Sequence, residues 1–571
     1  MDVRPSFPAV SLIRRLGLRA RRIIVGSLAC LLVATALFAA GGCDTAAVDD
    51  DLALILNFEP FETVVSGQIT DARTLAPVED VPVTVRFVGP NAGRVVDVDG
   101  GPVSEIRLQE VSLLSFGLDG TAPTPDAPVE LLLNVTADGY LETSQRVVVA
   151  GSEQTFSLSL VRLDDLPDGV TTAVEQFAAP GGTVFETVVV ATPPEAATRA
   201  GARLTLPAGT QIRDENGAPL SGTLTARVTY FSNRSNAARA AFPGGFTGVQ
   251  IDRDEDGADA RGTFITAGFA AITVRDDFGR EGESFSEPIG IQIDVPEGTD
   301  NPETGRPIRA GDAVPVYSFD EDTGAWTFEA RAPAQIVART ANRTEPVTSS
   351  GLPRVAIETS HLSYWNLDFL YPDLCAVAAP FVFDGLPFGF YRWSLERRAD
   401  GGVLQAGELY DGAIQFFNAP RDLPATLRLT DSDGDEIVSA DVDDICAGGT
   451  IDVPGGGGEP GRRVTVEAQI AVTCPSDDLE IRPSNVILWY RPETGRRWTR
   501  AVLRNGRIVL PGLIDGSSYV VGLWLDDAWK FETMLLDLDG IDDDNVDVTR
   551  RDETTYEVEV RYVDDDGFLC D

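Results

Sequence analysis

The chain has 571 residues, and its 89 acidic side chains against 46 basic ones give a formal net charge of −43 at pH 7, which excludes nucleic acid as a partner because its phosphates would be repelled. The composition excludes an intrinsically disordered chain, since 43% of the residues are hydrophobic and 8% are aromatic. The sequence holds one histidine, so it excludes a His-dependent catalytic triad elsewhere and a zinc site built from several histidines.

Residues 1–42 are predicted to be a secretory signal peptide. Five arginines between Arg14 and Arg22 precede the apolar run "IIVGSLACLLVATALFAA", and small residues and Cys43 follow it, which is the order typical of such a signal. The segment "FAAGGC" resembles the lipobox of bacterial lipoproteins, with Ala40 where leucine is usual. The resemblance implies cleavage before Cys43 and lipidation of its thiol, with residues 43–60 as a tether.

The alternative for this terminus is a transmembrane anchor from about Ile23 to Ala40, near the lower length limit for a span. Either interpretation places the body of the protein outside the cytoplasm. We expect a lipid-anchored protein of the cell envelope, at the outer membrane or cell surface. Asp44 directly after the lipidated cysteine favours the inner membrane in some bacteria. The predicted lipid makes the membrane a partner of the N-terminus.

Alternation of apolar and polar residues dominates the rest of the chain. The segments "VPVTVRF", "LTARVTYF", "IGIQIDV" and "YEVEVRYV" alternate with a period of two, as half-buried β-strands do. Turn clusters such as "DENGAP" and "RNGR" separate them, and helical periodicity is scarce. We therefore predict an all-β chain of serial β-sandwich domains, transthyretin-like or immunoglobulin-like.

The first sandwich is predicted from a set of matching positions in "VVSGQITDARTLAPVEDVPVTVRF" and "VTADGYLETSQRVVVAGSEQTFSLSLV". The positions are Gly67, Ile69, Asp71, Pro77, Val81, Val83, Val85, Ala137, Asp138, Gly139 and Tyr140. They resemble the carboxypeptidase regulatory-like domain, a transthyretin-type sandwich, over residues 61–163. Pro77 stiffens a loop, and Gly139 turns the chain so that Tyr140 packs inward. The resemblance implies a scaffold and not a peptidase.

Three further modules follow. Residues 164–371 contain "LTLPAGT" and "EPIGIQIDVP", which resemble the ZU-type sandwich of ankyrins and netrin receptors together with the second sandwich that packs after it. The resemblance implies a double β-sandwich region. Two more sandwiches are predicted at 372–453 and 463–571, on either side of the Gly-rich linker 454–462.

Cysteine usage supports export. Two of the six cysteines belong to the signal and the lipid anchor, and the remaining four allow three pairings. Their placement favours Cys375–Cys446 and Cys474–Cys570, each spanning one C-terminal module. Metal ligation is the alternative, but no CxxC spacing is present.

The tripeptide His361-Leu362-Ser363 contains the single histidine. It is similar to the His-Phe/Leu-Ser/Thr tripeptide at which adhesion receptors and some ZU-type proteins cut their own backbone. That chemistry needs the hydroxyl of Ser363 to attack the preceding carbonyl, a base at His361, and a strained turn around the scissile peptide. The alternative is that His361 ends a strand, Ser363 bonds locally and the next aromatic residues pack inward.

Acidic clusters suggest a calcium site. Asp252, Asp254 and Asp256 alternate and are followed by Gly257, and alternating carboxylates on a Gly-containing loop are typical of Ca²⁺ ligands. The bidentate glutamate of a complete EF-hand loop is missing, because Thr263 occupies its position. The similar cluster at 431–436 lacks the glycine at the sixth position. The alternative is a set of solvated Asp-rich turns in an acidic protein.

These observations predict a non-catalytic exported lipoprotein that acts as a surface or periplasmic scaffold or binding protein. One alternative is a glycan- or ligand-capture lipoprotein that works with an outer-membrane transporter, or an accessory factor of a hydrolase. Another is a surface protein that cleaves itself between Leu362 and Ser363. Envelope proteins and glycans are the expected partners, and Ca²⁺ is the one cofactor for which the sequence offers ligands.

Overall fold

The computed structural model describes residues 54–57, 61–336, 351–454 and 463–563 apart from short gaps. The gaps are 75, 80, 98–99, 322, 387–390, 410–411, 432–433, 475–478, 483–485, 494–497, 515, 526–527, 537–545 and 552–554. The predicted signal peptide, Cys43 and Cys570 lie outside the described residues. Among the residues that the structure describes, none of the helices has the length and apolarity needed to cross a membrane.

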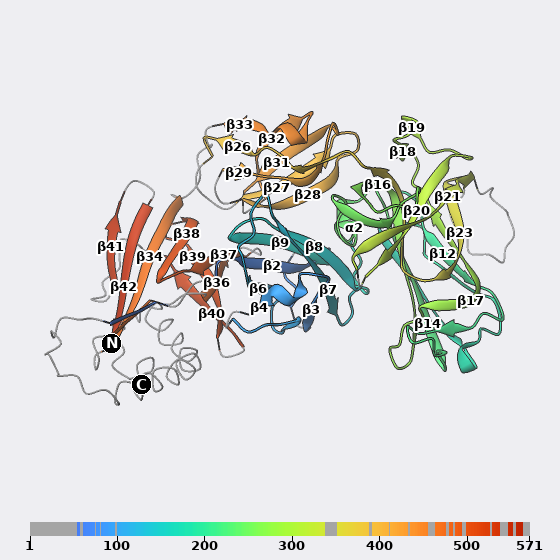
Figure 1. Cartoon of the computed structure of the whole chain (residues 1–571), viewed down its shortest axis with the longest axis horizontal. Helices are drawn as coiled ribbons and strands as arrows, with labels where there is room; N and C mark the ends of the chain where they lie inside the picture. The colour runs from blue at the N-terminus through green and yellow to red at the C-terminus, as the bar shows by residue number, and fades with distance from the viewer. Residues whose placement is uncertain are drawn as a thin grey trace, which may run out of the picture.

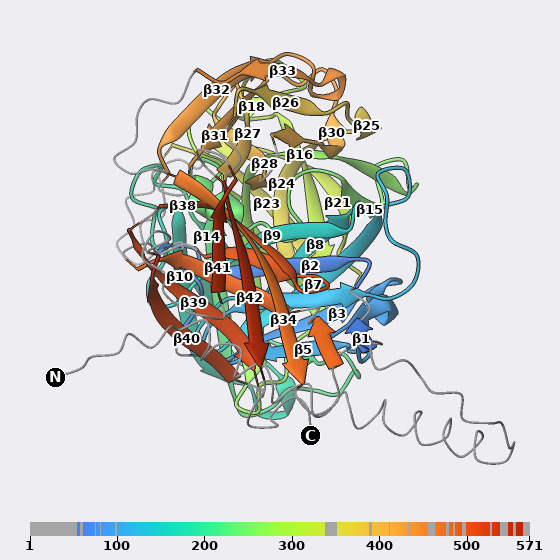
Figure 2. The same cartoon turned by 90° about the vertical axis from the view of Figure 1, so that its left-hand side faces the viewer.

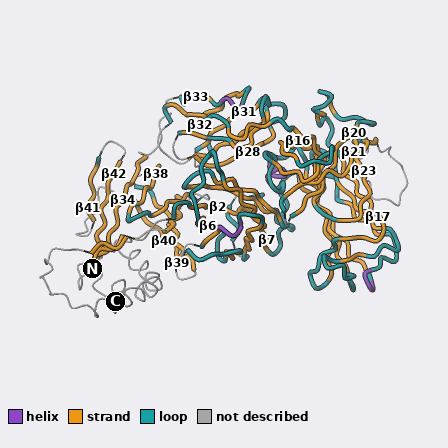
Figure 3. The backbone as a smooth tube through the Cα atoms, in the orientation of Figure 1, coloured by secondary structure: helices purple, strands orange, loops and turns teal. Residues whose placement is uncertain are grey.

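Nearly all regular structure is β-strand (Figure 3), and the chain is all-β with serial β-sandwich domains, as predicted. Figure 1 shows residues 61–163 in the centre, with the C-terminal module on one side and residues 164–371 on the other. Residues 372–453 lie above them in this view. In Figure 2 the C-terminal strands lie in front of the first module, so the chain returns to its beginning.

The first module consists of two four-stranded sheets that share one apolar core. One sheet has the order β4 (Val95–Val96), β6 (Leu113–Leu118), β2 (Val64–Asp71) and β9 (Glu153–Leu160). The other has the order β5 (Glu105–Leu108), β3 (Val83–Val88), β7 (Val129–Ala137) and β8 (Thr143–Val149), and the short helix η1 (Ala92–Arg94) precedes β4.

Strand β2 is buried along its whole length, on both faces. Val65 and Ile69 point into the sandwich core, and Gly67 between them lies under the ring of Phe156, whose Cζ would be 2.2 Å from a Cβ at position 67. This close approach explains the glycine. The opposite face of β2 includes Val64, which belongs to an apolar cluster shared with the C-terminal module.

Residues 164–371 build two larger sheets. The seven-stranded sheet contains β10 (Val170–Ala178), β14 (Thr223–Phe231), β16 (Ala260–Asp276), β15 (Val249–Arg253), β21 (Ala325–Pro333), β20 (Ala313–Asp320) and β24 (Tyr364–Tyr371). The six-stranded sheet contains β11 (Val188–Ala191), β12 (Ala202–Leu206), β13 (Ile212–Arg213), β17 (Ser284–Asp294), β23 (Pro353–His361) and β22 (Gln335–Ile336). Smaller elements are β18 (Asp300–Asn301), β19 (Arg306–Pro307), η2 (Pro180–Gly182) and α2 (Asn236–Ala240).

The long strand β16 contributes to two different cores. Ile265 and Ile272 lie in the core between the two sheets, whereas Phe264 and Phe269 belong to an aromatic core on the other face. The inward and outward positions exchange at a bulge, where the register with β24 shifts before Phe269 and Gly268 has a φ of 128°. Burial on both faces explains why this strand shows no polar alternation.

The sequence leads us to expect a ZU-type sandwich and a second sandwich that packs after it between 164 and 371, and the described strands of this region are joined through shared sheets. Strands from both halves of the region join the same two sheets: β17 pairs with β23, β15 with β21, and β16 with β24. The two cores therefore lie on opposite faces of one shared sheet. The physical reason is the 17-residue length of β16, which lets its two ends pair with different neighbours.

Residues 372–453 form a smaller module around one apolar core. Its strands are β25 (Leu374–Val377) with β30 (Phe417–Pro420); β26 (Phe381–Asp384) between β29 (Ala413–Ile414) and β33 (Gly449–Asp452); and β28 (Gly402–Leu409), β27 (Tyr391–Arg397), β31 (Ala425–Thr430) and β32 (Glu436–Val442) in that order. A short helix, η3 (Ile445–Ala447), links the last sheet to β33.

The C-terminal module also has two sheets. One contains β35 (Leu479–Arg482), β34 (Arg463–Cys474), β42 (Thr555–Val563), β41 (Val546–Arg550) and β38 (Arg507–Ile514). The other contains β37 (Thr499–Leu503), β36 (Val486–Pro492), β39 (Ser518–Leu525) and β40 (Ala528–Leu535). Part of the predicted tether joins the first sheet, because β1 (Leu54–Asn57) pairs in parallel with β35.

Candidate functional site

The His361-Leu362-Ser363 tripeptide lies at a corner between the two sheets of the 164–371 region. Strand β23 ends at His361 in the six-stranded sheet, and β24 begins at Tyr364 in the seven-stranded sheet. Leu362 is buried, at 8% exposure, and packs into the core between the sheets. The corner therefore connects the two layers of the sandwich.

The hydroxyl of Ser363 is occupied by the backbone of Phe319. The Phe319 N–H donates to Ser363 Oγ at 3.0 Å, and Ser363 Oγ–H donates to the carbonyl oxygen of the same residue. Phe319 belongs to β20, which also pairs with β24. The hydroxyl of Ser363, the candidate nucleophile, thus both donates to and accepts from the backbone of the neighbouring strand β20.

The imidazole of His361 faces a different partner. Its Nε2 lies 3.3 Å from Glu329 Oε1, and its ring packs against Trp365 with 5.1 Å between ring centroids. The hydrogen bond from His361 lowers the pKa of the Glu329 carboxyl, with a further contribution from Ser318, whose hydroxyl donates to it at 2.6 Å. The Glu329 carboxylate thus accepts hydrogen bonds from both His361 and Ser318.

The corner lacks one contact that self-cleavage needs. No hydrogen bond joins His361 to Ser363, both of which are described. The geometry favours a structural corner, and cleavage stays a prediction for experiment.

The acidic cluster at 252–256 lies in the hairpin turn between β15 and β16. Asp254 Oδ1 accepts the backbone N–H groups of Asp256 at 2.9 Å and Ala258 at 3.0 Å. The Gly257 N–H donates to the Asp254 carbonyl, and Gly257 has a φ of 82°. This carboxylate organises its own turn, as Asx turns do.

The same turn recurs along the chain as Asp-x-x-Gly-x. In each copy the aspartate Oδ1 accepts the N–H four residues later, and the glycine N–H donates to the aspartate carbonyl with a positive glycine φ. The copies in the described residues begin at Asp97, Asp214, Asp254, Asp276 and Asp431. These five aspartates therefore shape turns of the described chain by binding its backbone.

Over the described ranges, no group of three or more His, Cys, Asp and Glu side chains is arranged to hold a metal ion. The carboxylates of Asp252, Asp254 and Asp256 fall within this search. Calcium binding at this turn remains a prediction, and the first role of Asp254 is to bind backbone.

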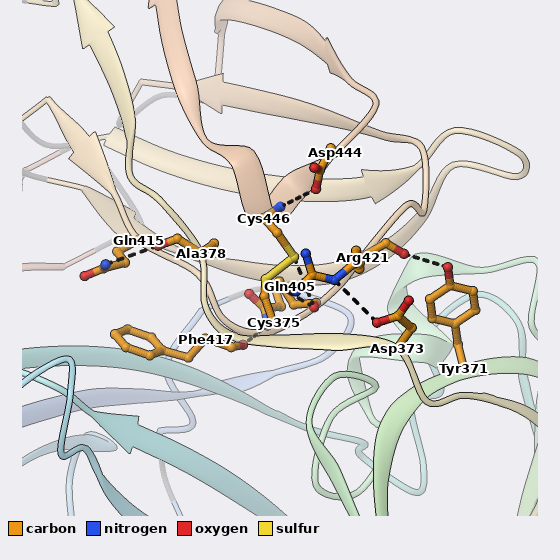
Figure 4. The surroundings of a disulfide bond; sticks show 11 residues. Tyr371, Asp373, Cys375, Ala378, Gln405, Gln415, Phe417, Arg421, Asp444 and Cys446 are labelled. Atoms are coloured by element: carbon orange, nitrogen blue, oxygen red, sulfur yellow. Dashed lines mark hydrogen bonds and ion pairs between the residues drawn. A yellow bond between two sulfur atoms is a disulfide. The ribbon is translucent and has the colours of Figure 1, made fainter.

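The predicted disulfide Cys375–Cys446 is present, with Cα atoms 5.9 Å apart (Figure 4). Cys375 lies on β25, and Cys446 lies in η3, where the side chain of Asp444 accepts its N–H at 2.9 Å. The bond closes residues 71 apart and joins the start of this module to its end. The predicted Cys474–Cys570 pair lies outside the residues whose side chains are described.

Between the first and the C-terminal modules lies a cavity of about 380 Å³ that is half open to solvent and that was not predicted from the sequence. Its charged lining consists of Glu153 from β9 and Arg500, Arg504 and Arg507 from β37, β38 and the turn between them. A signal was available: "RRWTRAVLRNGR" holds five arginines and no acid in a strongly acidic chain. The pairing with Glu153, 347 positions from Arg500, had no such signal.

No family model and no curated protein matches this chain. Among solved structures it is similar to two B repeat units of the collagen-binding protein of Staphylococcus aureus, with 10% identity, a TM-score of 0.11 and coverage of 88% of this chain and 100% of that one. It is also similar to the full-length RrgB pilus protein of Streptococcus pneumoniae, with 8% identity, a TM-score of 0.12 and coverage of 88% and 99%. At these TM-scores the likeness carries no conclusion about function.

Proposed function

We propose that this chain is an exported, lipid-anchored and non-catalytic scaffold or binding protein of the cell envelope. The observation that carries the proposal is that its sandwiches pack against one another as one continuous body. If the domains did not contact one another, the outer face of β2 would be exposed to solvent. Instead, β2 is buried on both faces. Such packing would hold the other domains at a fixed distance from the lipid-anchored N-terminus.

Ion pairs and hydrogen bonds support this packing between the first module and the 164–371 region. Arg261 of β16 binds Glu130 of β7 at 2.7 Å, and Glu130 also binds Arg146 at 2.8 Å. Arg146 in turn donates to the carbonyl of Gly324 at 3.0 Å. The arginines outweigh the effect of burial on Glu130 and lower the pKa of its carboxyl.

A polar cluster of the first module, formed by Asp71, Tyr140 and Arg162, lies where this module passes into the 164–371 region. The hydroxyl of Tyr140 donates to Asp71 Oδ2 at 3.2 Å, and Arg162 donates to that hydroxyl at 2.6 Å. Asp71 Oδ1 also accepts the N–H groups of Arg73 and Thr74. Asp71 and Tyr140, two of the positions that carry the transthyretin-type resemblance, thus meet in one cluster.

Metabolic labelling and fractionation test the anchored scaffold. Expressed with its N-terminus intact in a bacterium with two membranes, the wild-type chain should incorporate a labelled fatty acid, sediment with the envelope and cross-link there to envelope proteins. Cys43→Ser should remove the label and release the chain from membranes. An unlabelled wild-type chain that stays in the cytoplasm would contradict the proposal.

A second candidate function is ligand capture, in which the protein binds a small molecule or glycan for an outer-membrane transporter. The arginine-lined cavity between the first and C-terminal modules favours it, since scaffolding alone needs no such hollow. A glycan array with the soluble chain separates the two roles: saturable binding to a glycan supports capture, and its absence leaves the scaffold.

A further inference from the structure

Three arginines line the cavity between the first and C-terminal modules, and two of them face each other across a tight turn. Arg504 and Arg507 flank the two-residue turn Asn505–Gly506, and their backbone N–H and carbonyl groups bond reciprocally at 2.9 Å. Both turn residues have positive φ, of 51° and 77°, as this turn type requires. Like charges placed opposite each other on a hairpin repel, and nearby negative charge would offset this repulsion.

The available carboxylates do not balance these arginines. Glu153 is shared between Arg500, at 3.2 Å, and Arg504, at 3.4 Å. Arg507 binds Glu467 at 2.8 Å, and a further arginine contacts this carboxylate too. Two carboxylates therefore face three guanidinium groups of the cavity, and one positive charge stays uncompensated among the described residues.

Arg500 carries donors that the described protein does not satisfy. It is 6% exposed, and its Nε and Nη1 atoms are buried without a hydrogen-bond partner among the described residues. Arg504 Nε is in the same condition, although its terminal nitrogens donate to the carbonyls of Phe61 and Ser152. Buried N–H groups of a cation without acceptors are unfavourable, so the positive charge of Arg500 is only partly compensated at the wall of the cavity.

The rest of the lining is apolar. Val502, Val509 and Pro511 form part of the wall, together with Ala501. A volume of about 380 Å³ lies within the range of small-molecule sites, which combine apolar walls with a few polar groups. A bare inorganic anion would leave these walls facing water, whereas an anion with an apolar body would cover them.

We infer that this cavity binds a small organic carboxylate, with its carboxylate group against the arginines and its apolar body against the valine and proline wall. Guanidinium groups match the planar geometry of carboxylates. One uncompensated positive charge fits a singly charged ligand. The surrounding chain carries a net charge of −43 and repels anions in general, so this site is suited to select one. The inference goes beyond the scaffold role and does not depend on lipid anchoring.

Calorimetric titration of the full soluble chain with hexanoate tests the inference. The wild type should show saturable binding of one equivalent that weakens as salt is raised, because the arginine charge is screened. The neutral analogue hexanamide and inorganic phosphate should each bind at least tenfold more weakly. Equal binding of phosphate would overturn the organic carboxylate, and absence of saturable hexanoate binding would overturn the site.

Variants keep the test specific. Arg500→Gln should weaken hexanoate binding at least tenfold, whereas Arg331→Gln, which removes the same charge from an ion-paired arginine in the 164–371 region, should leave it unchanged. Val509→Phe should fill the cavity and block binding with every charge in place. Circular dichroism confirms that each variant is folded. Unchanged binding in folded Arg500→Gln and Val509→Phe would place hexanoate elsewhere and contradict the inference, while the scaffold function would stand.

Discussion

The side-chain amide of Gln68 donates a hydrogen bond of 2.6 Å to the backbone carbonyl of Trp498, a residue 430 positions later in the chain. Beside it, Val64 and Leu113 of the first module share an apolar cluster with Trp489 and Trp498 of the last. Near the cavity, Arg500 and Arg504 add ion pairs to Glu153. The last module therefore docks on the first one and does not extend freely from the Gly-rich linker.

This docking predicts the result of cutting the linker. A protease site inserted within 455–460 should allow cleavage, and the C-terminal piece should still co-elute with the rest in size-exclusion chromatography. Val64→Asp places an unpaired carboxylate in the apolar cluster, where Val64 is 1% exposed, and should make the pieces separate. Separation of the wild-type pieces would show that the modules are joined by the linker alone.

Strand alternation allowed the fold class to be predicted, because each sandwich has inward residues at every second position. Module docking could not be predicted in this way. Ser66 and Gln68 on β2 have the polar character of an exposed face, yet both are buried because another module covers them. The continuous apolar run of β16 likewise gave no sign that its two faces lie in different cores.

The candidate sites were predicted to different extents, because some depend on residues close in sequence and others on residues from different modules. The sequence favoured Cys375–Cys446 among three possible pairings because this bridge spans one predicted module, and the structure contains it. The Asp252–Gly257 segment resembled a calcium loop, but a turn that binds its own backbone uses the same aspartate and glycine at the same spacing. Sequence alone cannot separate these two uses. The Arg500 cavity requires Glu153 from another module, so only the docked arrangement reveals it.

The disulfide predicts a measurable contribution to stability. Replacing Cys375 and Cys446 together by serine should lower the free energy of unfolding by about 4 kcal/mol, which is the chain-entropy value for a loop of this size. Urea denaturation of the wild type with and without reductant gives the comparison. Non-reducing peptide mapping should also show Cys474 linked to Cys570. A Cys446–Cys474 bridge would contradict both pairings and the division into two C-terminal modules.

The hairpin turn at 254–258 predicts that Asp254 stabilises the protein without metal. Asp254→Ala removes the acceptor of two backbone N–H groups and should cost about 1 kcal/mol in urea denaturation with chelator present. Asp254→Asn keeps a side-chain oxygen and should lose less. Calorimetry with Ca²⁺ and a Mg²⁺ control tests the calcium hypothesis: a Ca²⁺-specific heat that disappears in Asp254→Ala with Asp256→Ala would establish a site here.

Asp400 predicts an acid-sensitive junction between the 164–371 region and the next module. Burial alone would raise its pKa, but the hydrogen bond from Arg397 and the charge of Arg239, 2.7 Å away, outweigh burial and lower the pKa to about 2. Burial lowers the pKa of Arg239, yet an arginine stays charged throughout the acid range. The pH dependence therefore belongs to the carboxyl group.

Because the folded pKa of Asp400 lies below the ordinary value, the stabilisation is complete above about pH 4 and is lost as the pH falls through 2. Asp400→Asn should lower the free energy of unfolding by about 2 kcal/mol at pH 7, and the difference from wild type should shrink between pH 4 and 2. Asp373→Asn, at an exposed pair with Arg421, serves as the control and should change little. A pH-independent difference would show that Asp400 acts by packing.

The corner at His361 predicts an intact chain. Ser363 Oγ is bound on both sides by the backbone of Phe319, and the His361 ring binds Glu329, so the hydroxyl is not presented to the Leu362 carbonyl by a base. Intact mass under denaturing conditions should show one full-length species after prolonged incubation. Ser363→Ala should leave that mass pattern unchanged and lower stability by about 1 kcal/mol, because the Phe319 N–H loses its acceptor. Fragments 43–362 and 363–571, absent from Ser363→Ala and slowed in His361→Ala, would instead establish self-cleavage and require a rearrangement of this corner.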